Sequence, residues 1–328
     1  MSKYSSDVEA ADALAGTYKN LAKEISKVIV GQDEVVRLVL TAIFCQGHSL
    51  LIGVPGLAKT LLVQTISRAL DLQFKRIQFT PDLMPSDILG AETMDKERNF
   101  KFIKGPVFAN IVLADEINRT PPKTQAALLE SMQEYAVTIA GQRYDLPRPF
   151  FVLATQNPIE QEGTYPLPEA QVDRFMLKVV VDYPSKSEEQ LIIRQNTLGL
   201  TTPPINPVAS TSEILTAKEL VRQVYMDEKV ENYILDIVFA TRFPEKYNLP
   251  KLKALIGFGG SPRASINLAL AAKAFAFLNS RAYVIPEDVR GICKDVLRHR
   301  IGLTYEAEAE NVNVEQVINE ILRVVNVP

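Results

Sequence analysis

One segment of the chain has the residue types and the spacing needed to bind phosphate groups. Two glycines, a lysine and a threonine stand between the apolar run 49–52 and a stretch with helical spacing. Glycines let backbone N–H groups turn toward phosphate oxygens, a lysine can reach the β and γ phosphates, and a threonine hydroxyl can bind Mg²⁺. The predicted nucleotide-binding residues are Gly53, Val54, Pro55, Gly56, Leu57, Ala58, Lys59, Thr60 and Leu61, and Thr60 is also a predicted metal ligand.

Ala58 departs from the usual phosphate-binding pattern, which has glycine at this position. Alanine would fit if the backbone there is already near-helical and not left-handed. Taken by itself, the loop also has a structural interpretation, as a tight turn between a strand and a helix.

Acidic and amide side chains follow two other apolar runs. Asp115 and Glu116 come directly after 111–114, and Asn157 comes shortly after 150–154. Asp115 can hold Mg²⁺ through water, Glu116 can polarise an attacking water molecule, and Asn157 can orient that water beside the γ phosphate. The alternatives are an acidic turn at Asp115 and an Asn-Pro turn at Asn157. Because ligands bind at the carboxyl ends of strands in α/β sheets, the combination with the glycine-rich loop favours an ATP site.

The elements that must position these residues alternate between short apolar runs and helical patterns. Such runs predict a parallel sheet inside a three-layer α/β domain, here an αβα P-loop domain. The expected strands are 49–52, 74–78, 111–114, 150–154 and 176–181. Periodicity over 8–27 predicts an amphipathic helix, which we expect to be an N-terminal appendage.

The second half of the chain has a different composition. The proline-rich stretch 201–207 predicts a linker, and nearly everything after it has helical spacing. We expect helices at 217–225, 228–242, 262–280, 286–300 and 313–325, which form a smaller all-α lid domain. The predicted organisation is an N-terminal segment 1–32, an α/β core 33–184, a linker 185–209 and a lid domain 210–328.

Composition excludes several classes of protein. The chain has 328 residues, a hydrophobic content of 47% and a net charge of −3, so disorder and a global attraction to nucleic acid are disfavoured. The two cysteines could form at most one disulfide, which is too few to hold together a chain this long. We expect neither cysteine to be a nucleophile. His48 and His299 have no neighbours at metal-ligand spacing. No apolar run approaches 18 residues. We expect a cytoplasmic protein without membrane insertion.

Taken together, these motifs resemble the AAA+ ATPases, and within them the MoxR family of the helix-2-insert group. The resemblance spans nearly the whole chain, and the loop 53–60 is a common MoxR form of Walker A. The stretches 115–119, 154–158 and 169–175 resemble Walker B, sensor 1 and the arginine-finger segment, and 259–263 resembles sensor 2. By the same resemblance, the apolar stretch around Gly31 lines an adenine pocket, with Ile29, Val30 and Gly31 as its residues.

The resemblance also assigns roles to two arginines. Arg174 would enter the site of a neighbouring subunit and stabilise charge on the γ phosphate, and Arg263 would reach that phosphate from the lid. The structural alternatives are a surface arginine before a buried Phe175 and a surface charge at a helix end. Arg119 is a further candidate for contact between subunits. The stretches 83–108 and 135–146 resemble the helix-2 insert and the hairpin before sensor 1, both candidates for substrate contact.

The resemblance implies an ATPase that uses ATP and Mg²⁺, forms a homo-oligomer, expected to be a hexameric ring, and remodels partner proteins. Such clients often carry von Willebrand factor A domains. Three alternatives remain: a motor subunit similar to that of magnesium chelatase, a nucleic-acid motor related to minichromosome-maintenance helicases, and a nucleotide-binding scaffold without turnover. The single cation in 138–143 disfavours nucleic acid, and Glu116 disfavours the scaffold.

Overall fold

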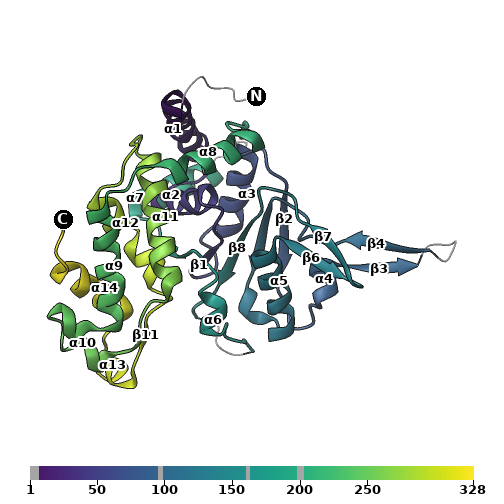
Figure 1. Cartoon of the computed structure of the whole chain (residues 1–328). Coiled ribbons are helices and arrows are strands. Elements are labelled where there is room, and N and C mark those ends of the chain that lie inside the picture. Colours follow the sequence, from purple (N-terminus) through teal and green to yellow (C-terminus); the bar gives the residue numbers. More distant parts are fainter. Residues whose placement is uncertain (1–6, 95–98, 160–162, 198–202) are drawn as a thin grey trace. The chain divides into compact units, whose positions relative to one another are not determined.

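The computed structural model describes residues 7–94, 99–159, 163–197 and 203–328. It divides into two compact units (Figure 1). The sheet unit comprises the described parts of 19–175 and 179–215, and the helical unit comprises those of 1–18, 176–178 and 216–328. Within these described residues, no helix is both long enough and apolar enough to cross a membrane.

A five-stranded sheet forms the centre of the sheet unit, with the strand order β2-β5-β8-β1-β9. The pairs β2·β5, β5·β8 and β1·β8 are parallel, as the alternation of apolar runs and helical patterns predicted. Every strand begins within one residue of its predicted start. The strands are β1 (Ser49–Ile52), β2 (Phe74–Gln78), β5 (Ile111–Asp115), β8 (Phe151–Gln156) and β9 (Leu177–Val180).

Helices pack on the sheet through its alternating side chains. On one face, Leu128 and Met132 of α5 join a buried cluster that includes Val112, Ala114 and Val152 of the strands. The residues between these strand positions point to the opposite face. This packing confirms the predicted three-layer α/β class. The helices of this unit are α1 (Asp7–Ile25, which begins in the helical unit), α2 (Asp33–Phe44), α3 (Lys59–Ala69), α4 (Pro85–Leu89), η1 (Ile117–Arg119), α5 (Pro122–Glu134), α6 (Glu169–Val172) and α7 (Lys186–Thr197).

Two antiparallel hairpins extend from the sheet unit (Figure 1). One pairs β3 (Gly90–Met94) with β4 (Phe100–Lys104), and the other pairs β6 (Ala136–Ile139) with β7 (Gln142–Asp145). Phe102 and Tyr144 stack with their ring centroids 4.3 Å apart, so the hairpins contact each other. They lie in the predicted insert 83–108 and the predicted hairpin 135–146, and residues 95–98 of the insert lie outside the described residues.

Two expectations about the flanking segments are wrong. Helix α1 is not an appendage along its whole length, because Leu21 and Ile25 are fully buried and Glu24 accepts a hydrogen bond from the backbone N–H of Asn206. The predicted linker 185–209 contains α7, none of whose side chains is fully buried. A helix without a buried stripe leaves little periodic signal, which explains why the sequence did not reveal it. Residues 201 and 202 of the proline-rich stretch lie outside the described residues.

The helical unit contains the five predicted helices and several short elements. Pro262 and Pro286 occupy the first turns of their helices, where the missing N–H is tolerated. A two-stranded antiparallel pair is added to the expected helices. The elements are α8 (Thr211–Gln223, which begins in the sheet unit), α9 (Glu228–Arg242), η2 (Pro244–Tyr247), α10 (Leu252–Leu255), β10 (Ile256–Phe258), α11 (Pro262–Leu278), α12 (Pro286–Leu297), β11 (Gly302–Leu303), α13 (Tyr305–Ala309) and α14 (Val314–Val324).

Two arginines at the end of α12 bind the segment 176–178 within the helical unit. Arg298 Nη1 donates to the carbonyl of Lys178 over 2.6 Å, and Arg300 Nη1 donates to the carbonyl of Met176 over 3.2 Å. Arg300 is buried, and it also donates to the carbonyl of Val296. The chain therefore enters β9 through residues that two guanidinium groups hold in place, one of them buried.

Candidate active site

The glycine-rich loop and the ends of two strands line a cavity of about 420 Å³. The loop follows β1, the acidic pair comes at the end of β5, and the amide comes just after β8, so all three lie at carboxyl ends of neighbouring strands. The lining residues are Pro55, Gly56, Leu57, Ala58, Lys59, Thr60, Leu61, Asp115, Glu116, Thr155 and Asn157. The structure thus brings most of the predicted site residues together.

Lys59 holds the loop in its curved shape. Its Nζ donates to the carbonyl of Gly53 over 2.6 Å and to the carbonyl of Val54 over 2.9 Å. Burial lowers the pKa of Lys59, while the negative charges of Asp115 and Glu116 act to raise it. The ammonium group therefore stands ready to exchange two weak carbonyl partners for phosphate oxygens, which carry full negative charge.

The backbone at Ala58 does not meet the condition under which alanine would fit without strain. Ala58 has φ 53° and ψ 24°, which is left-handed and not near-helical. A left-handed alanine costs roughly 1 kcal/mol relative to glycine, so the loop tolerates this strain where most such loops have glycine. Gly56 also has a positive φ of 87°, and a Cβ at Gly53 would lie 2.7 Å from the carbonyl oxygen of Val181. Positions 53 and 56 therefore require glycine.

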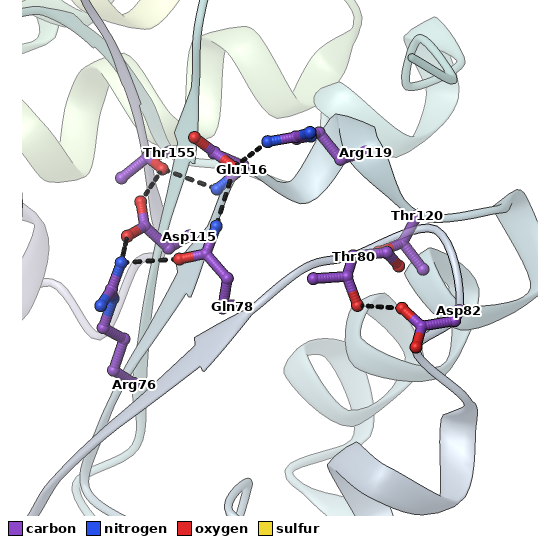
Figure 2. Close-up of polar contacts among 9 residues, drawn as sticks. All are labelled: Arg76, Gln78, Thr80, Asp82, Asp115, Glu116, Arg119, Thr120 and Thr155. Atoms are coloured by element: carbon purple, nitrogen blue, oxygen red, sulfur yellow. Dashed lines mark hydrogen bonds and ion pairs between the residues drawn. The ribbon is translucent and has the colours of Figure 1, made fainter. Parts of the chain in front are cut away.

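Asp115 is fixed from both sides (Figure 2). Its Oδ1 accepts a hydrogen bond of 2.5 Å from the Thr155 hydroxyl, and its Oδ2 accepts bonds of 2.9 and 2.6 Å from Nε and Nη2 of Arg76. The oxygen of the same Thr155 hydroxyl accepts the backbone N–H of Glu116 over 2.8 Å. Thr155 therefore sets the relative position of the two carboxylates.

Glu116 has a left-handed backbone, with φ 57° and ψ 49°, directly after the end of β5. Its Oε2 accepts hydrogen bonds from Gln78 Nε2 over 2.8 Å and from Arg119 Nη1 over 3.0 Å (Figure 2). Strained backbone of this kind is often found where a reactive side chain must take a fixed direction. The carboxylate lines the cavity and is held by two donors from the chain itself.

The donors around the cavity suit a hard divalent cation. Thr60 supplies a hydroxyl and Asp115 a carboxylate, and oxygen ligands of this kind fit Mg²⁺. Within the described residues there is no group of three or more His, Cys, Asp or Glu that could enclose a metal ion alone. Such a sparse protein ligand set is typical of Mg²⁺ that is bound together with phosphates.

Asn157 both forms an Asn-Pro turn and lines the cavity, which are the two interpretations that the sequence left open. Its Oδ1 accepts the backbone N–H of Ile159 over 3.1 Å, which is a local turn, and the buried residue also lines the cavity. The turn therefore fixes the amide at the cavity wall.

A second cavity of about 250 Å³ shares Gly56, Leu57, Ala58 and Leu61 with the first. Ile29 and Val30 line it, as expected of an adenine pocket, and Gly31 packs beside it, where a Cβ would lie 2.6 Å from Glu188 Cδ. The lining residues from α7 were not predicted from the sequence, because the predicted linker covers that segment. The remaining lining residues are Val28, Gln32, Leu62, Pro184, Ile192, Gln195 and Asn196.

Comparison with known proteins identifies the group to which this arrangement belongs. Residues 48–177 match the model of the ATPase family associated with various cellular activities (AAA), and residues 252–321 match the AAA lid domain. The Mycobacterium tuberculosis protein named Chaperone MoxR1 is 47% identical over 97% of this chain and 85% of its own length. The chain belongs to the MoxR family of AAA+ ATPases.

Two further relatives agree with this assignment. The Methylorubrum extorquens protein named MoxR is 29% identical over 96% of both chains. A crystal structure of a proposed ATPase from Cytophaga hutchinsonii has a TM-score of 0.92 and 48% identity, and the match covers 98% of this chain and 97% of the other. The MoxR relationship therefore holds for both the sheet unit and the helical unit.

Arg174 is not among the residues that line the first cavity, and Arg263 belongs to the helical unit. Arg174 Nη1 donates to the carbonyl of Leu129 in α5 over 3.1 Å. Arg263 is the second residue of α11, after a turn in which Gly260 N–H donates to the Thr241 hydroxyl oxygen over 2.9 Å. Their roles at the γ phosphate remain predictions. Arg119, a candidate for contact between subunits, binds Glu116 of its own chain.

Three residues that hydrogen-bond to Asp115 or Glu116 were not predicted from the sequence as part of the site: Arg76, Gln78 and Thr155. Arg76 and Gln78 are two positions apart, so the alternation of a strand places both on the same face of β2. This spacing can be read from the sequence, but no local pattern predicts that β2 lies beside β5. The register that pairs Gln78 with Asp115 comes only from the structure.

Proposed function

We propose that the chain binds ATP with Mg²⁺ and hydrolyses it to ADP and phosphate. The observation that carries the proposal is a single cavity lined by Lys59 and Thr60 and by Asp115 and Glu116. The first two residues follow β1, and the other two lie at the end of β5, with only β8 between these strands. Membership of an ATPase family supports the same reaction. A cation for the phosphates and a carboxylate for water are the two groups that this hydrolysis needs.

Each residue has a role that follows from its position. Lys59 binds the β and γ phosphates, backbone N–H groups of the loop bind their oxygens, and Thr60 and Asp115 hold the metal ion. Bound Mg²⁺ would neutralise charge on the phosphates. Glu116 accepts a proton from the attacking water, and Asn157 orients that water. Ile29, Val30 and the α7 side chains enclose the adenine.

We infer further that the protein acts as a ring, expected to have six members. Arg174 makes its described contact with a backbone carbonyl in its own chain, outside the set of residues that line the first cavity. An arginine supplied by a neighbour can raise turnover by several powers of ten, and Arg174 is the residue proposed for that role. Arg263 is proposed to sense the γ phosphate from the helical unit.

The proposed client is a protein, contacted by the hairpin β3–β4. This hairpin exposes Met94, Phe100 and Ile103, whose exposed fractions are 58%, 71% and 55%. Large apolar side chains at the surface of a protruding hairpin suit apolar segments of a polypeptide better than they suit phosphate groups. The name of the relative Chaperone MoxR1 supports a chaperone-like role. Clients with von Willebrand factor A domains remain part of this proposal.

The hydrolysis proposal is tested with two substitutions that separate binding from turnover. Lys59→Ala removes the cation from the phosphates, so ATP binding is expected to be lost. Glu116→Gln keeps the shape of the site and is expected to bind ATP but to turn over at least about a hundredfold more slowly. Lys123→Ala, at an exposed lysine on α5, is the control for loss of a positive charge.

Equilibrium binding of labelled ATP and release of phosphate measure the two steps in each variant. Equal loss of binding in Lys59→Ala and Glu116→Gln would show that Glu116 has been assigned wrongly. Unchanged turnover in Glu116→Gln would contradict the hydrolysis mechanism itself.

The client proposal has its own test, with a reduced and alkylated model protein that stays unfolded. Addition of this polypeptide is expected to raise phosphate release by the wild type. A variant with serine at Met94, Phe100 and Ile103 should keep its basal turnover and lose the response. An equal response in this variant would contradict the role of the hairpin.

A further inference from the structure

The side chain of Gln125 joins two separate segments of the sheet unit. Gln125 lies in the first half of α5 and is fully buried. Its NH₂ group donates to the carbonyls of Ile117 over 3.1 Å, Thr120 over 2.9 Å and Tyr165 over 3.0 Å. Because three carbonyl oxygens surround this end of the amide, its partners determine its orientation. One side chain therefore connects the turn η1 with the segment 163–168.

The turn η1 follows directly after the carboxylate proposed to activate water. Glu116 is the residue before η1, and its carbonyl accepts the backbone N–H of Arg119 over 2.9 Å. The carbonyl of Asn118 in the same turn accepts the backbone N–H of Tyr165 over 2.6 Å. Both backbone polar groups of Tyr165 are thus bound, the N–H by η1 and the carbonyl by Gln125.

The segment 163–168 depends on such contacts because it runs without helix or strand. Pro166 and Pro168 have no backbone N–H, so the segment can neither pair as a regular strand nor continue a helix. Leu167 joins the buried cluster of the sheet unit and supplies an apolar anchor. The bonds at Tyr165 therefore fix the direction in which the chain enters α6.

Helix α5 also contacts the far end of this path. Arg174 comes two residues after the end of α6, and its Nη1 donates to the carbonyl of Leu129 over 3.1 Å. Leu129 lies four residues after Gln125, which is about one helical turn. The chain from Tyr165 to the guanidinium group of Arg174 is therefore held at both ends by successive turns of α5.

We propose that Gln125 is a positioning residue for Arg174. Its amide holds the segment 163–168 against η1, so the arginine that one subunit presents to its neighbour keeps a fixed position relative to the turn after Glu116 in its own chain. Gln125 is not among the residues that line the first cavity, so it has no direct contact with the proposed nucleotide site. This inference rests on the proposed action of Arg174 in a neighbouring subunit.

A purely supporting role for Gln125 makes a different prediction. If the amide only stabilises the fold, its loss lowers the amount of assembled protein and leaves the rate per assembled ring unchanged. If the amide positions Arg174, its loss lowers that rate, even when the amide is removed only from the subunit that supplies the arginine. The rate per mixed ring therefore separates the two roles.

The experiment uses mixtures of full-length variants. Arg174→Ala supplies a working loop, and Lys59→Ala supplies the arginine from a subunit that has no working loop of its own. Gln125→Met is then added to the Lys59→Ala subunit alone, and Gln125→Asn, which keeps a shorter amide, is a second variant should the first fold poorly. Gln133→Met removes an exposed amide from the same helix and is the matched control. Phosphate release is divided by the amount of mixed ring that is purified through one tag on each kind of subunit.

We expect Gln125→Met in the Lys59→Ala subunit to lower the restored rate about tenfold, because a misplacement of about 1 Å can cost up to about a hundredfold in rate. Gln125→Asn should lower the rate in the same direction, and Gln133→Met should leave it unchanged.

Three results would overturn the positioning role while leaving the action of Arg174 across the interface intact. They are equal rates per mixed ring with and without the Gln125 substitutions, an equal fall with Gln133→Met, and loss of assembly by both Gln125 variants, which would show that the amide serves the fold. If the Lys59→Ala subunit restores no activity to Arg174→Ala, the proposed action of Arg174 fails, and this inference fails with it.

Discussion

Gln78 and Glu116 lie 38 positions apart in the sequence and are joined by a hydrogen bond of 2.8 Å between Nε2 and Oε2. The bond links the end of β2 to the residue that follows β5, and it occupies the carboxylate proposed to activate water. Such a donor makes the carboxylate a weaker base toward water, because it stabilises the charged form. The side chain of Glu116 is therefore held in place by a donor from its own chain.

Replacement of this amide should raise basal ATP hydrolysis. Gln78→Leu removes the donor to Glu116 and keeps a side chain of similar size. A hydrogen bond to a partly exposed carboxylate is worth about 1 kcal/mol, so basal turnover is expected to rise about fivefold, with ATP affinity nearly unchanged.

Phosphate release at saturating ATP measures this effect. Gln73→Leu, at an exposed position just before β2, serves as the control for loss of an amide. A fall in turnover in Gln78→Leu would mean that the amide helps to align Glu116 for the reaction.

His48 predicts how stability depends on pH. Its Nδ1 accepts the backbone N–H of Val152 over 3.0 Å, so its Nε2 donates to the carbonyl of Met132 over 3.1 Å, and the buried ring is neutral. Burial lowers the pKa of His48 from 6.5 to about 4. The sequence showed no metal-ligand spacing around His48, and the structure shows a buried histidine with a structural role.

Because the folded-state pKa lies below the unfolded value, protonation favours the unfolded chain. The stabilising contribution is fully present above pH 6.5 and is lost as the pH falls toward about 4. It amounts to about 3 kcal/mol of unfolding free energy. Replacing His48 by Gln should lower stability at neutral pH and flatten the decline between these two values. Urea unfolding across this pH range tests the prediction, and parallel curves for both proteins would contradict it.

Arg300 should stabilise the helical unit far more than a surface arginine does. It is 3% exposed and donates to backbone carbonyls of Met176 and Val296. Arg300→Met removes these donors and leaves the carbonyls unsatisfied, so the free energy of unfolding is expected to fall by about 2–3 kcal/mol.

Arg323→Met is the matched control. That side chain is 73% exposed and pairs with Glu320 on α14, and such a surface pair is worth about 0.5 kcal/mol. Urea midpoints of the two variants should differ clearly. Equal midpoints would show that Arg300 does not hold the segment 176–178 in place.

The sequence predicted the strands and the phosphate loop well because both depend on short-range patterns. Apolar runs bounded by turn residues mark β1 and β5, and the spacing from Gly53 to Thr60 marks the loop. Three things could not be found in this way. The left-handed backbone of Ala58 depends on the curvature of the whole loop, and α7 lacks a buried stripe. The contacts of Arg76 and Gln78 require the order of strands in the sheet, which no local pattern encodes.

Arg174 is placed so that it can leave its own chain at small cost. Its guanidinium group donates to the carbonyl of Leu129, a neutral acceptor, over 3.1 Å. Its Nε is buried without a hydrogen-bond partner among the described residues. A buried donor without a partner costs about 1–3 kcal/mol, and a negatively charged acceptor from another molecule would remove that cost.

The last prediction tests whether Arg174 completes the site of a neighbouring subunit. Arg174→Ala should bind ATP nearly normally in its own loop yet hydrolyse it slowly at every protein concentration, whereas the specific activity of the wild type should rise with concentration as rings form. Lys59→Ala lacks a working loop but keeps Arg174. In a random one-to-one mixture of these variants, about a quarter of the interfaces pair an intact loop with an intact arginine, so part of the activity should return.

Mixing Lys59→Ala with the double variant Lys59→Ala/Arg174→Ala provides the control, since no interface in that mixture has a working loop, and no activity should return. Phosphate release is measured after co-assembly has been established by size-exclusion chromatography of differently tagged subunits. If Arg174→Ala and Lys59→Ala assemble together and remain inactive, Arg174 does not act across the interface. The buried Nε and the contact with Leu129 would then serve the fold of a single chain, and the ring mechanism would lose its main support.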